Sequence, residues 1–330
     1  MTVQAPLGLA LRSYAGRADV ASIVRIANAE AAAFDVEEVW AEDGLAAWFG
    51  HASEQFDPAR DVVMVELDGE VVGTGRVEWI DTRDGLYREY RHFGSVHPAH
   101  LGRGIGTALL AELEGRARLL AAQHGSDREL ILASFSAVGR PPERFLAANG
   151  YETVRWFSDM LRPNLDAIES PPMPDGVELR PVTADQHEAI WRANREAFRD
   201  HWGGADESLE MMQRILDDPD TDTGLWLIAW DGDEIAGGVW NEIRPHENEA
   251  LGVRRGWLGS VFTRRPWRKR GLASALIGRS LELLRDRGMT AAMLGVDADN
   301  PTGALGLYEA AGFEVHDRFV AMRKPMEARP

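Results

Sequence analysis

Two kinds of hydrophobic periodicity alternate along the chain, and their order predicts a mixed α/β fold. Short runs of alternating or continuous apolar residues are typical of strands, and apolar residues three or four positions apart are typical of amphipathic helices. In the first half the pattern predicts strands at 8–12, 62–67, 71–80, 93–97, 129–134 and 151–161. It predicts helices from about residue 20, within 34–59, from the glycine-containing segment 101–107 to about residue 123, and at 141–149.

A segment without hydrophobic periodicity then separates two halves of the chain. Residues 162–176 carry four prolines, which is typical of a linker. A chain of 330 residues is also longer than one ordinary hydrophobic core requires. The sequence therefore predicts an N-terminal domain at 1–162, a proline-rich linker at 163–175 and a C-terminal domain at 176–330.

The second half repeats the order of elements in the first. Strands are predicted at 177–180, 225–230, 234–243, 257–263, 291–296 and from 313, with helices at 184–198, 207–216, 271 to about 287, and 301–311. Residue-level matches support the repeat: the segments 149–152 and 311–314 read NGYE and AGFE and lie 162 positions apart. Gly104 and Gly271 lie 167 positions apart. We infer two copies of one domain, called below the first and second repeat.

A basic stretch between a predicted strand and a predicted helix indicates an anion site. Residues 264–270 include five basic residues, although the whole chain carries a net charge of −17. A helix start offers unpaired backbone N–H groups and the positive end of the helix dipole, so it binds phosphate readily. Two alternatives are an exposed charge run that happens to precede a helix and a nucleic-acid patch.

Composition limits the kind of protein and its partners. The acidic balance argues against nucleic acid and anionic membranes, because the field of the whole protein repels both. The absence of cysteine excludes disulfides, cysteine zinc sites and a thiol nucleophile. No leader-like start and no apolar run near the ~20 residues of a membrane span are found. We therefore expect a cytoplasmic protein.

Two motifs of the second repeat resemble the GNAT superfamily of N-acyltransferases. Arg268-x-x-Gly271-x-Ala273, between strand and helix, is similar to that family's acyl-CoA loop. The segments 299–301 and 307–313, with a Tyr ahead of a Gly-Phe, resemble its last motif. The resemblance covers both repeats and implies two GNAT-like domains. Each is a mostly antiparallel mixed sheet with a splayed central strand pair, flanked by helices.

The resemblance also implies the cofactor and its contacts. Acetyl-CoA is expected on the loop, and the amine attacks the thioester directly in a ternary complex. Tyr308 is expected to protonate the leaving thiolate, although a tyrosine packing under the sheet is the alternative. The residues implied in cofactor binding are Val261, Phe262, Thr263, Arg268, Lys269, Arg270, Gly271, Leu272, Ala273, Ser274 and Asn300.

The first repeat departs from the pattern. It keeps the loop glycines but has Leu101 in place of the leading Gln or Arg, and Leu146 at the position of Tyr308. Leucine cannot donate a proton, so we predict a degenerate domain that is structural or binds acyl-CoA without turnover. Its cofactor-binding candidates are Val96, Gly102, Arg103, Gly104, Gly106 and Thr107.

The acceptor side has no motif, and several groups are candidates for the base. Carboxylates Glu242 and Asp297 come first, with His246 and Glu247 as alternatives, although each is also an ordinary surface residue. The segment from Asp200 onward is expected to cover the acceptor. Residues 200–222 hold eight acidic residues and one basic residue, which draws a cationic substrate or forms a solvated helix face. No second histidine lies at ligand spacing from the one at 201, so no metal is expected.

Three functions follow from these observations. The first is an acetyl-CoA-dependent N-acetyltransferase acting on a primary amine of a small molecule, with the second repeat active. The second is a mycothiol-synthase-like tandem acetyltransferase, which has the same two-domain plan. The third is a non-catalytic acyl-CoA-binding sensor or scaffold, which an amine screen with detection of free thiol separates from the first.

Overall fold

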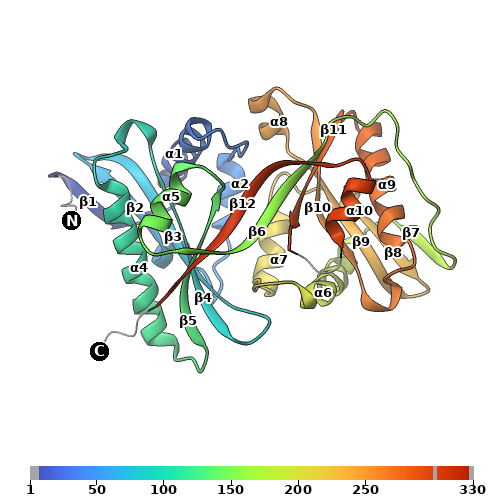
Figure 1. Cartoon of the computed structure of the whole chain (residues 1–330), viewed down its shortest axis with the longest axis horizontal. Helices are drawn as coiled ribbons and strands as arrows, with labels where there is room; N and C mark the ends of the chain where they lie inside the picture. The colour runs from blue at the N-terminus through green and yellow to red at the C-terminus, as the bar shows by residue number, and fades with distance from the viewer. Residues whose placement is uncertain (1–6, 300–302, 327–330) are drawn as a thin grey trace. The chain divides into compact units, whose positions relative to one another are not determined.

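The computed structural model describes residues 7–299 and 303–326, which form two compact units. The first unit comprises Met1–Val154, Gly203–Arg214 and Val320–Pro330. The second comprises Arg155–Trp202 and Ile215–Phe319. Both units can be followed by colour in Figure 1.

The first unit is built on a mixed sheet with helices on both faces. Its strand order is β1-β2-β3-β4-β5, with the end of β12 next to β5. The pairs from β1 to β4 are antiparallel, whereas β4 and β5 are parallel. The strands are β1 (Leu9–Ser13), β2 (Val62–Leu67), β3 (Glu70–Asp81), β4 (Tyr87–Val96), β5 (Glu129–Ala137) and β12 (Glu314–Pro325). The helices are α1 (Val20–Ala33), α2 (Glu42–Trp48), α3 (Pro58–Asp61), α4 (Ile105–His124) and α5 (Pro141–Ala148).

The second unit repeats this arrangement with the order β6-β11-β10-β9-β8-β7. Its central pair, β10 and β11, is parallel, and the other pairs are antiparallel. The strands are β6 (Glu152–Arg162), β7 (Val177–Arg180), β8 (Leu227–Asp231), β9 (Glu234–Ile243), β10 (Arg255–Thr263) and β11 (Ala291–Asp297). The helices are α6 (His187–Ala197), α8 (Pro245–Leu251), α9 (Leu272–Asp286) and α10 (Ala304–Ala310). Helix α7 (Leu209–Asp217) belongs to the first unit up to Arg214 and to the second unit from Ile215.

The mostly antiparallel mixed sheet predicted for each domain is confirmed. The sequence pattern placed most elements, but it missed α8, whose residues were assigned to a loop, and it began β4 six residues late. Proline at the first position of α8 and its short polar sequence explain the first miss. The alternation of Tyr87, Glu89 and Arg91 with their neighbours is too polar to indicate a strand.

The closing strand of each repeat lies in the unit built from the other repeat. From Arg155 onward β6 belongs to the second unit, where Met160 pairs with Leu294 of β11. From Val320 onward β12 belongs to the first unit. The predicted boundaries at 162 and 176 describe the sequence repeats, and as domain limits they stay a prediction.

The core of each unit lies between its sheet and one long helix. Helix α4 crosses the first unit's strands, and α9 and α10 lie beside those of the second (Figure 1). Glycines let the helices approach: a Cβ at Gly75 would lie 2.8 Å from Leu113 of α4, and one at Gly256 would lie 2.4 Å from Leu284 of α9. Within the described ranges, no helix has the length and apolarity needed to cross a membrane.

Candidate active site

The central strands of the second unit part beyond a short paired region. Parallel pairing joins Arg255–Trp257 of β10 to Ala291–Met293 of β11, while β10 itself continues to Thr263. The register of β10 with β9 shifts between Leu258 and Ser260, so Gly259 forms a bulge and is exposed. Past the paired region, β10 is therefore open on the side that faced β11, where its peptide groups can meet a ligand.

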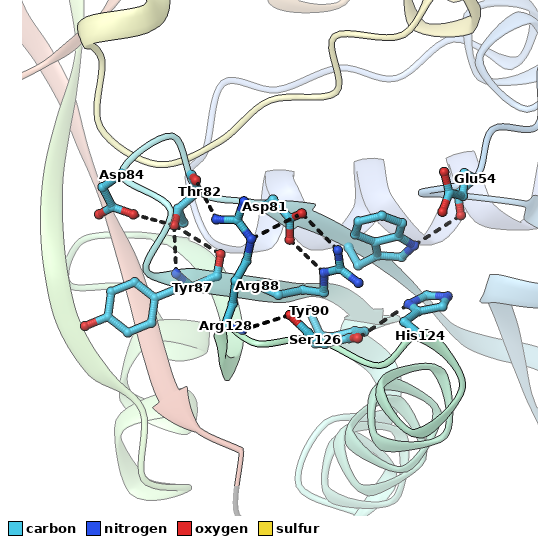
Figure 2. A network of polar contacts seen from close by, with 11 residues as sticks. Glu54, Asp81, Thr82, Asp84, Tyr87, Arg88, Tyr90, His124, Ser126 and Arg128 are labelled. Carbon is cyan, nitrogen blue, oxygen red and sulfur yellow. Dashed lines mark hydrogen bonds and ion pairs between the residues drawn. The ribbon is translucent and has the colours of Figure 1, made fainter.

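The first unit has the same parting strands without the bulge. β4 pairs with β5 only from Tyr87 to Arg91, and its register with β3 is unbroken. A polar network fastens the closed end of this pair, as Figure 2 shows. Asp81 accepts hydrogen bonds of 2.7 and 2.9 Å from Arg88, and Arg128, next to the start of β5, lies 3.4 Å from it. The network leaves only the other end of the pair open.

The loop after β10 has the form of an anion cradle. A 3₁₀ turn at Arg265–Trp267 is followed by Lys269 and Gly271, whose φ angles are 61° and 83°. Gly271 is the N-cap of α9, and no side chain caps that helix. The helix start thus presents backbone donors to an anion. Those donors belong to the predicted residues Leu272, Ala273 and Ser274.

The corresponding loop of the first unit has nearly the same backbone. Its 3₁₀ turn is Pro98–His100, and Gly102 and Gly104 have φ angles of 73° and 80°. Gly104 caps α4 without a side-chain contribution, and the predicted residues Gly106 and Thr107 lie in the first turn. Arg103 Nη1 lies 3.1 Å from His100 Nδ1. Only the side chains distinguish the two loops.

Three arginines of the basic stretch face acidic partners. Arg264 donates to Glu196 at 2.9 Å, and Arg265 donates to Asp200. Arg268 donates to Asp200 at 2.9 Å and to the carbonyls of Ala197 (2.8 Å) and Thr263 (3.1 Å). Hydrogen bonds from Arg265 and then Arg268 lower the pKa of Asp200 to about 2. These arginines therefore join the loop to the end of α6.

The remaining predicted cofactor residues differ in exposure. Lys269 and Arg270 are exposed, and Arg270 lies 4.0 Å from Asp231. The Phe262 side chain is buried in the core, whereas Val261 and Thr263 are half-buried along the open part of β10. Asn300 lies outside the described residues.

In the first unit, the strand donor predicted at Val96 is occupied. Glu30 of α1 accepts a 3.1 Å hydrogen bond from the Val96 N–H. Burial raises the pKa of the Glu30 carboxyl group. Phe93 of β4 and Phe135 of β5 stack nearly parallel across the parting strands, with centroids 6.3 Å apart. The positions in the second repeat that correspond to Phe93 and Phe135, 167 and 162 residues later in the chain, hold Ser260 and Asp297.

Tyr308 lies on α10 and is 7% exposed. Its ring meets Phe313 edge-on at 6.2 Å, and burial raises the pKa of its phenol to about 12. The phenol is therefore neutral at physiological pH and carries a proton to donate. Leu146 occupies the equivalent position on α5, and it is buried in the first unit's core.

Glu242 lies on β9, next to the bulge that Gly259 forms in β10. It pairs with Trp257 across β9 and β10, and a Cβ at Gly259 would lie 2.2 Å from its Oε1 atom. Arg244 donates to Oε2 at 3.1 Å through Nε and at 2.7 Å through Nη2. The carboxylate thus rests against the exposed glycine where the strands part.

The other predicted bases are tied to arginines. Asp297 accepts two 2.9 Å hydrogen bonds from Arg155 of β6, which fixes the end of β11. Glu247 is 4% exposed and accepts 2.9 Å hydrogen bonds from Arg255 and the indole of Trp257. Both carboxylates therefore hold structure in place, and Glu242 remains the base candidate with an exposed neighbour.

Asp220 is a further acidic group near Glu242 that was not singled out from the sequence. Burial, and then the charge of Asp218, raises the pKa of Asp220, and charges of His246, Arg244 and Glu242 also act on it. The acidic run at 200–222 was the available signal. Its basic member, Arg214, is fully buried in the first unit and donates to the carbonyls of His51 (2.6 Å) and Phe56 (3.3 Å).

The second unit thus has the parting strand pair, the uncapped helix start and the phenol on a later helix that the resemblance to N-acyltransferases implies. The family model described as Acetyltransferase (GNAT) family matches residues 23–133 and 187–313. The chain belongs to this family and carries its domain twice.

Several relatives share one name, mycothiol acetyltransferase. The mycothiol acetyltransferase of Streptomyces avermitilis is 36% identical over 239 residues, covering 67% of each chain. That of Geodermatophilus obscurus is 28% identical over 93% of this chain and 94% of its own. The predicted tandem GNAT acetyltransferase is thereby confirmed, and the chain is an N-acetyltransferase.

Solved structures agree with this plan along the whole chain. A GCN5-related N-acetyltransferase from Sphaerobacter thermophilus has a TM-score of 0.72 and 27% identity, covering 99% of this chain and 98% of its own. A tandem GNAT protein from the clavulanic acid biosynthesis pathway has a TM-score of 0.70 at 18% identity, covering 98% and 100%. The second likeness concerns the fold alone.

Proposed function

We propose that the second unit transfers the acetyl group of acetyl-CoA directly to a primary amine of a small molecule. The observation that carries this proposal is the placement of Glu242 against Gly259, where β10 and β11 part. The open strand leads directly into the uncapped start of α9. A proton acceptor and an anion cradle therefore belong to one continuous segment of the unit.

The donor acetyl-CoA fits the residues present. Backbone N–H groups at 272–274 would hold its pyrophosphate, aided by Lys269 and Arg270. The open edge at 261–263 would meet the pantetheine arm and the thioester carbonyl. Asn300 stays a proposed contact from the family resemblance. Arg268 serves this site by fixing the loop to α6, through Asp200 and Ala197.

The reaction then needs three proton transfers. Glu242 takes the proton of the ammonium group, so that the neutral amine attacks the thioester carbonyl in a ternary complex. The new C–N bond forms, the C–S bond breaks, and Tyr308 gives its proton to the thiolate. The second proton lost by the amine nitrogen restores the Tyr308 phenol, and Glu242 releases its proton to solvent. Burial keeps Tyr308 protonated, since its pKa is about 12. Asp297 is the weaker base candidate, because Arg155 holds both of its oxygens.

We propose that the first repeat does not turn over acyl-CoA. It lacks a phenol at Leu146, a bulge in β4 and a free N–H at Val96. Its loop nevertheless has the same backbone as that of the second repeat. Binding of acyl-CoA through Gly102, Arg103, Gly104, Gly106 and Thr107 therefore remains part of the proposal.

The named relatives suggest the acceptor. Because they are mycothiol acetyltransferases, we propose the amine whose acetylation yields mycothiol as the substrate. The acidic groups Asp218 and Asp220 near Glu242 support a cationic amine. The other candidate, an acyl-CoA sensor or scaffold, would bind the donor without releasing thiol.

A screen of amines tests the proposed function. The protein is incubated with acetyl-CoA and single amines, including mycothiol stripped of its acetyl group, and acetylated products are detected by mass. We expect one amine to gain an acetyl group in step with free CoA. Binding of acetyl-CoA without any acetylated amine would support the sensor instead.

A further inference from the structure

A buried carboxylate next to the proposed base has no role in the reaction as described. Glu247 on α8 is 4% exposed, and its partner Arg255 on β10 is 3% exposed. Their 2.9 Å ion pair is joined by the Trp257 indole, which donates to the same oxygen. A buried ion pair adds little net stability, so its value often lies in fixing a geometry.

The helix carrying Glu247 is itself held in register with β10. Asn248 donates to the Arg255 carbonyl at 2.9 Å and accepts from the Arg255 N–H at 3.1 Å. The carboxylate therefore has a fixed position relative to Trp257, the last residue of β10 before the strands part.

Arg244 connects this carboxylate to Glu242. It is the N-cap of α8, and its Nη1 atom lies 3.5 Å from Oε2 of Glu247. Its Nε and Nη2 atoms bind Glu242, and its guanidinium lies 4.4 Å from the centre of the Trp257 ring. A long flexible side chain is thus held by a carboxylate on each side and by an aromatic face.

We propose that Glu247 is a positioning residue for the proposed base: it holds Arg244 so that Arg244 holds the Glu242 carboxylate on Gly259. This inference rests on the proposed role of Glu242. The fixed cation limits the rotamers that the Glu242 carboxylate can adopt, so its Oε1 atom stays against Gly259. Other titratable groups near the network are Asp218, Asp220 and His246.

The test is the turnover of acetyl transfer to the amine in Glu247→Gln. The amide keeps the shape but loses the charge that holds Arg244. We expect kcat for the amine to fall roughly tenfold, because the proposed base is no longer held on Gly259. Affinity for acetyl-CoA should stay unchanged, and Glu247→Asp should restore part of the lost kcat. An unchanged kcat in folded Glu247→Gln overturns the proposal.

A double-mutant cycle separates positioning from general stability. In an Arg244→Gln background the effect of Glu247→Gln should vanish, because the link is already absent. Full additivity would contradict the proposal. Glu188→Gln, which breaks the exposed ion pair with Arg192, is the matched control and should change nothing.

Two further variants keep the result interpretable. If Glu247→Gln does not fold, Trp257→Phe keeps an aromatic ring and removes one donor to Glu247, so a smaller fall in kcat is expected and an unchanged kcat counts against the proposal. Glu242→Gln identifies the failing part. If that variant keeps full activity, the proposed base is wrong; if it is inactive while Glu247→Gln is normal, only the positioning role is wrong.

Discussion

At the scale of single residues, the two repeats differ at the positions where protons must move. The second repeat has Tyr308 on α10 and an exposed bulge at Gly259 beside Glu242. The first repeat has Leu146 in place of the tyrosine, and the Glu30 carboxylate accepts a hydrogen bond from the Val96 N–H. These differences make the second repeat the place where amine chemistry is expected.

Substitution of the two acidic candidates distinguishes a base from a structural carboxylate. Glu242→Gln should lower kcat by about 100-fold, because proton removal from the ammonium is lost. The dissociation constant of acetyl-CoA and the melting temperature should change little. Steady-state kinetics and calorimetry measure both effects.

Asp297→Asn serves as the matched variant. It removes a largely buried charge from Arg155, so it should lower the free energy of unfolding by about 3 kcal/mol while kcat falls much less. If Asp297→Asn removes activity at unchanged stability and Glu242→Gln does not, the two assignments are reversed.

Residue types were easier to predict than their partners. The repeat spacing identified Leu146 as the counterpart of Tyr308, because helix and glycine positions recur at fixed distances along the sequence. The acidic partners of Arg264, Arg265 and Arg268 were not predictable, since α6 is distant in sequence and meets the loop only in the folded unit. Glu242 was among the predicted base candidates, but its position against Gly259 depends on the bulge in β10, which the sequence does not show.

At the scale of elements, the loop before α9 owes its shape to backbone angles more than to charge. Positive φ angles recur at the same two places in both repeats, at Lys269 and Gly271 and at Gly102 and Gly104. The glycines were visible in the sequence, but the strained lysine was not. A non-glycine residue in this region costs about 1–2 kcal/mol, and such strain is often found at binding sites.

Replacing the capping glycine should weaken donor binding. Gly271→Ala places a Cβ on a residue with a φ of 83°, so the loop must shift. The backbone N–H groups at the start of α9 then no longer point at the bound phosphate. We expect the dissociation constant of acetyl-CoA at the second repeat, measured by calorimetry, and the KM for acetyl-CoA to rise at least about tenfold.

Gly104→Ala introduces the same strain at φ 80° in the first repeat. It should leave kcat and KM for acetyl-CoA unchanged. Equal loss of activity in both variants would show that the account assigns the wrong loop, or that both loops serve turnover.

Strand and helix order was predictable from periodicity, but the parting of the strands was not. Apolar residues continue along β10 past Trp257, at Leu258, Val261 and Phe262, so nothing in the pattern marks where pairing with β11 ends. The family resemblance supplied that expectation. The short helix α8, which carries Glu247, was hidden by its polar composition.

At the scale of the whole molecule, the closing strands belong to the units of the opposite repeats. The end of β12 is fixed in the first unit by ion pairs of Arg323 with Glu89 and of Lys324 with Glu114. The two closing strands resemble one another in sequence, so the pattern could not show which sheet each one joins. Their side-chain partners are tertiary contacts that only the structure gives.

The pH dependence of stability tests the packing of the first unit around this strand. His92 Nε2 lies 2.7 Å from the hydroxyl of Tyr151, which donates to Glu114 at 3.0 Å. Burial lowers the pKa of His92 to about 4, whereas the unfolded value is about 6.5. The neutral ring is therefore favoured by folding. Its contribution of about 3 kcal/mol is complete above pH 6.5 and is lost as the pH falls toward 4.

Urea unfolding at pH 4.5 and 7 measures this effect. The drop in stability of the wild type on acidification should be larger than that of His92→Gln, which has no titrating ring. The difference between the two proteins isolates His92 from the carboxylates that also titrate in this range. Equal drops in both proteins would show that His92 is not held neutral.

The central claim is that the second repeat carries out acetyl transfer, and Tyr308 tests it most directly. The measurement is the turnover number for acetyl-CoA and the accepted amine in Tyr308→Phe, beside Arg103→Ala of the first repeat. We predict that Tyr308→Phe keeps its fold and donor affinity but loses about 100-fold in kcat, while Arg103→Ala retains wild-type turnover. Full activity in Tyr308→Phe, or loss of activity in Arg103→Ala alone, would contradict the account.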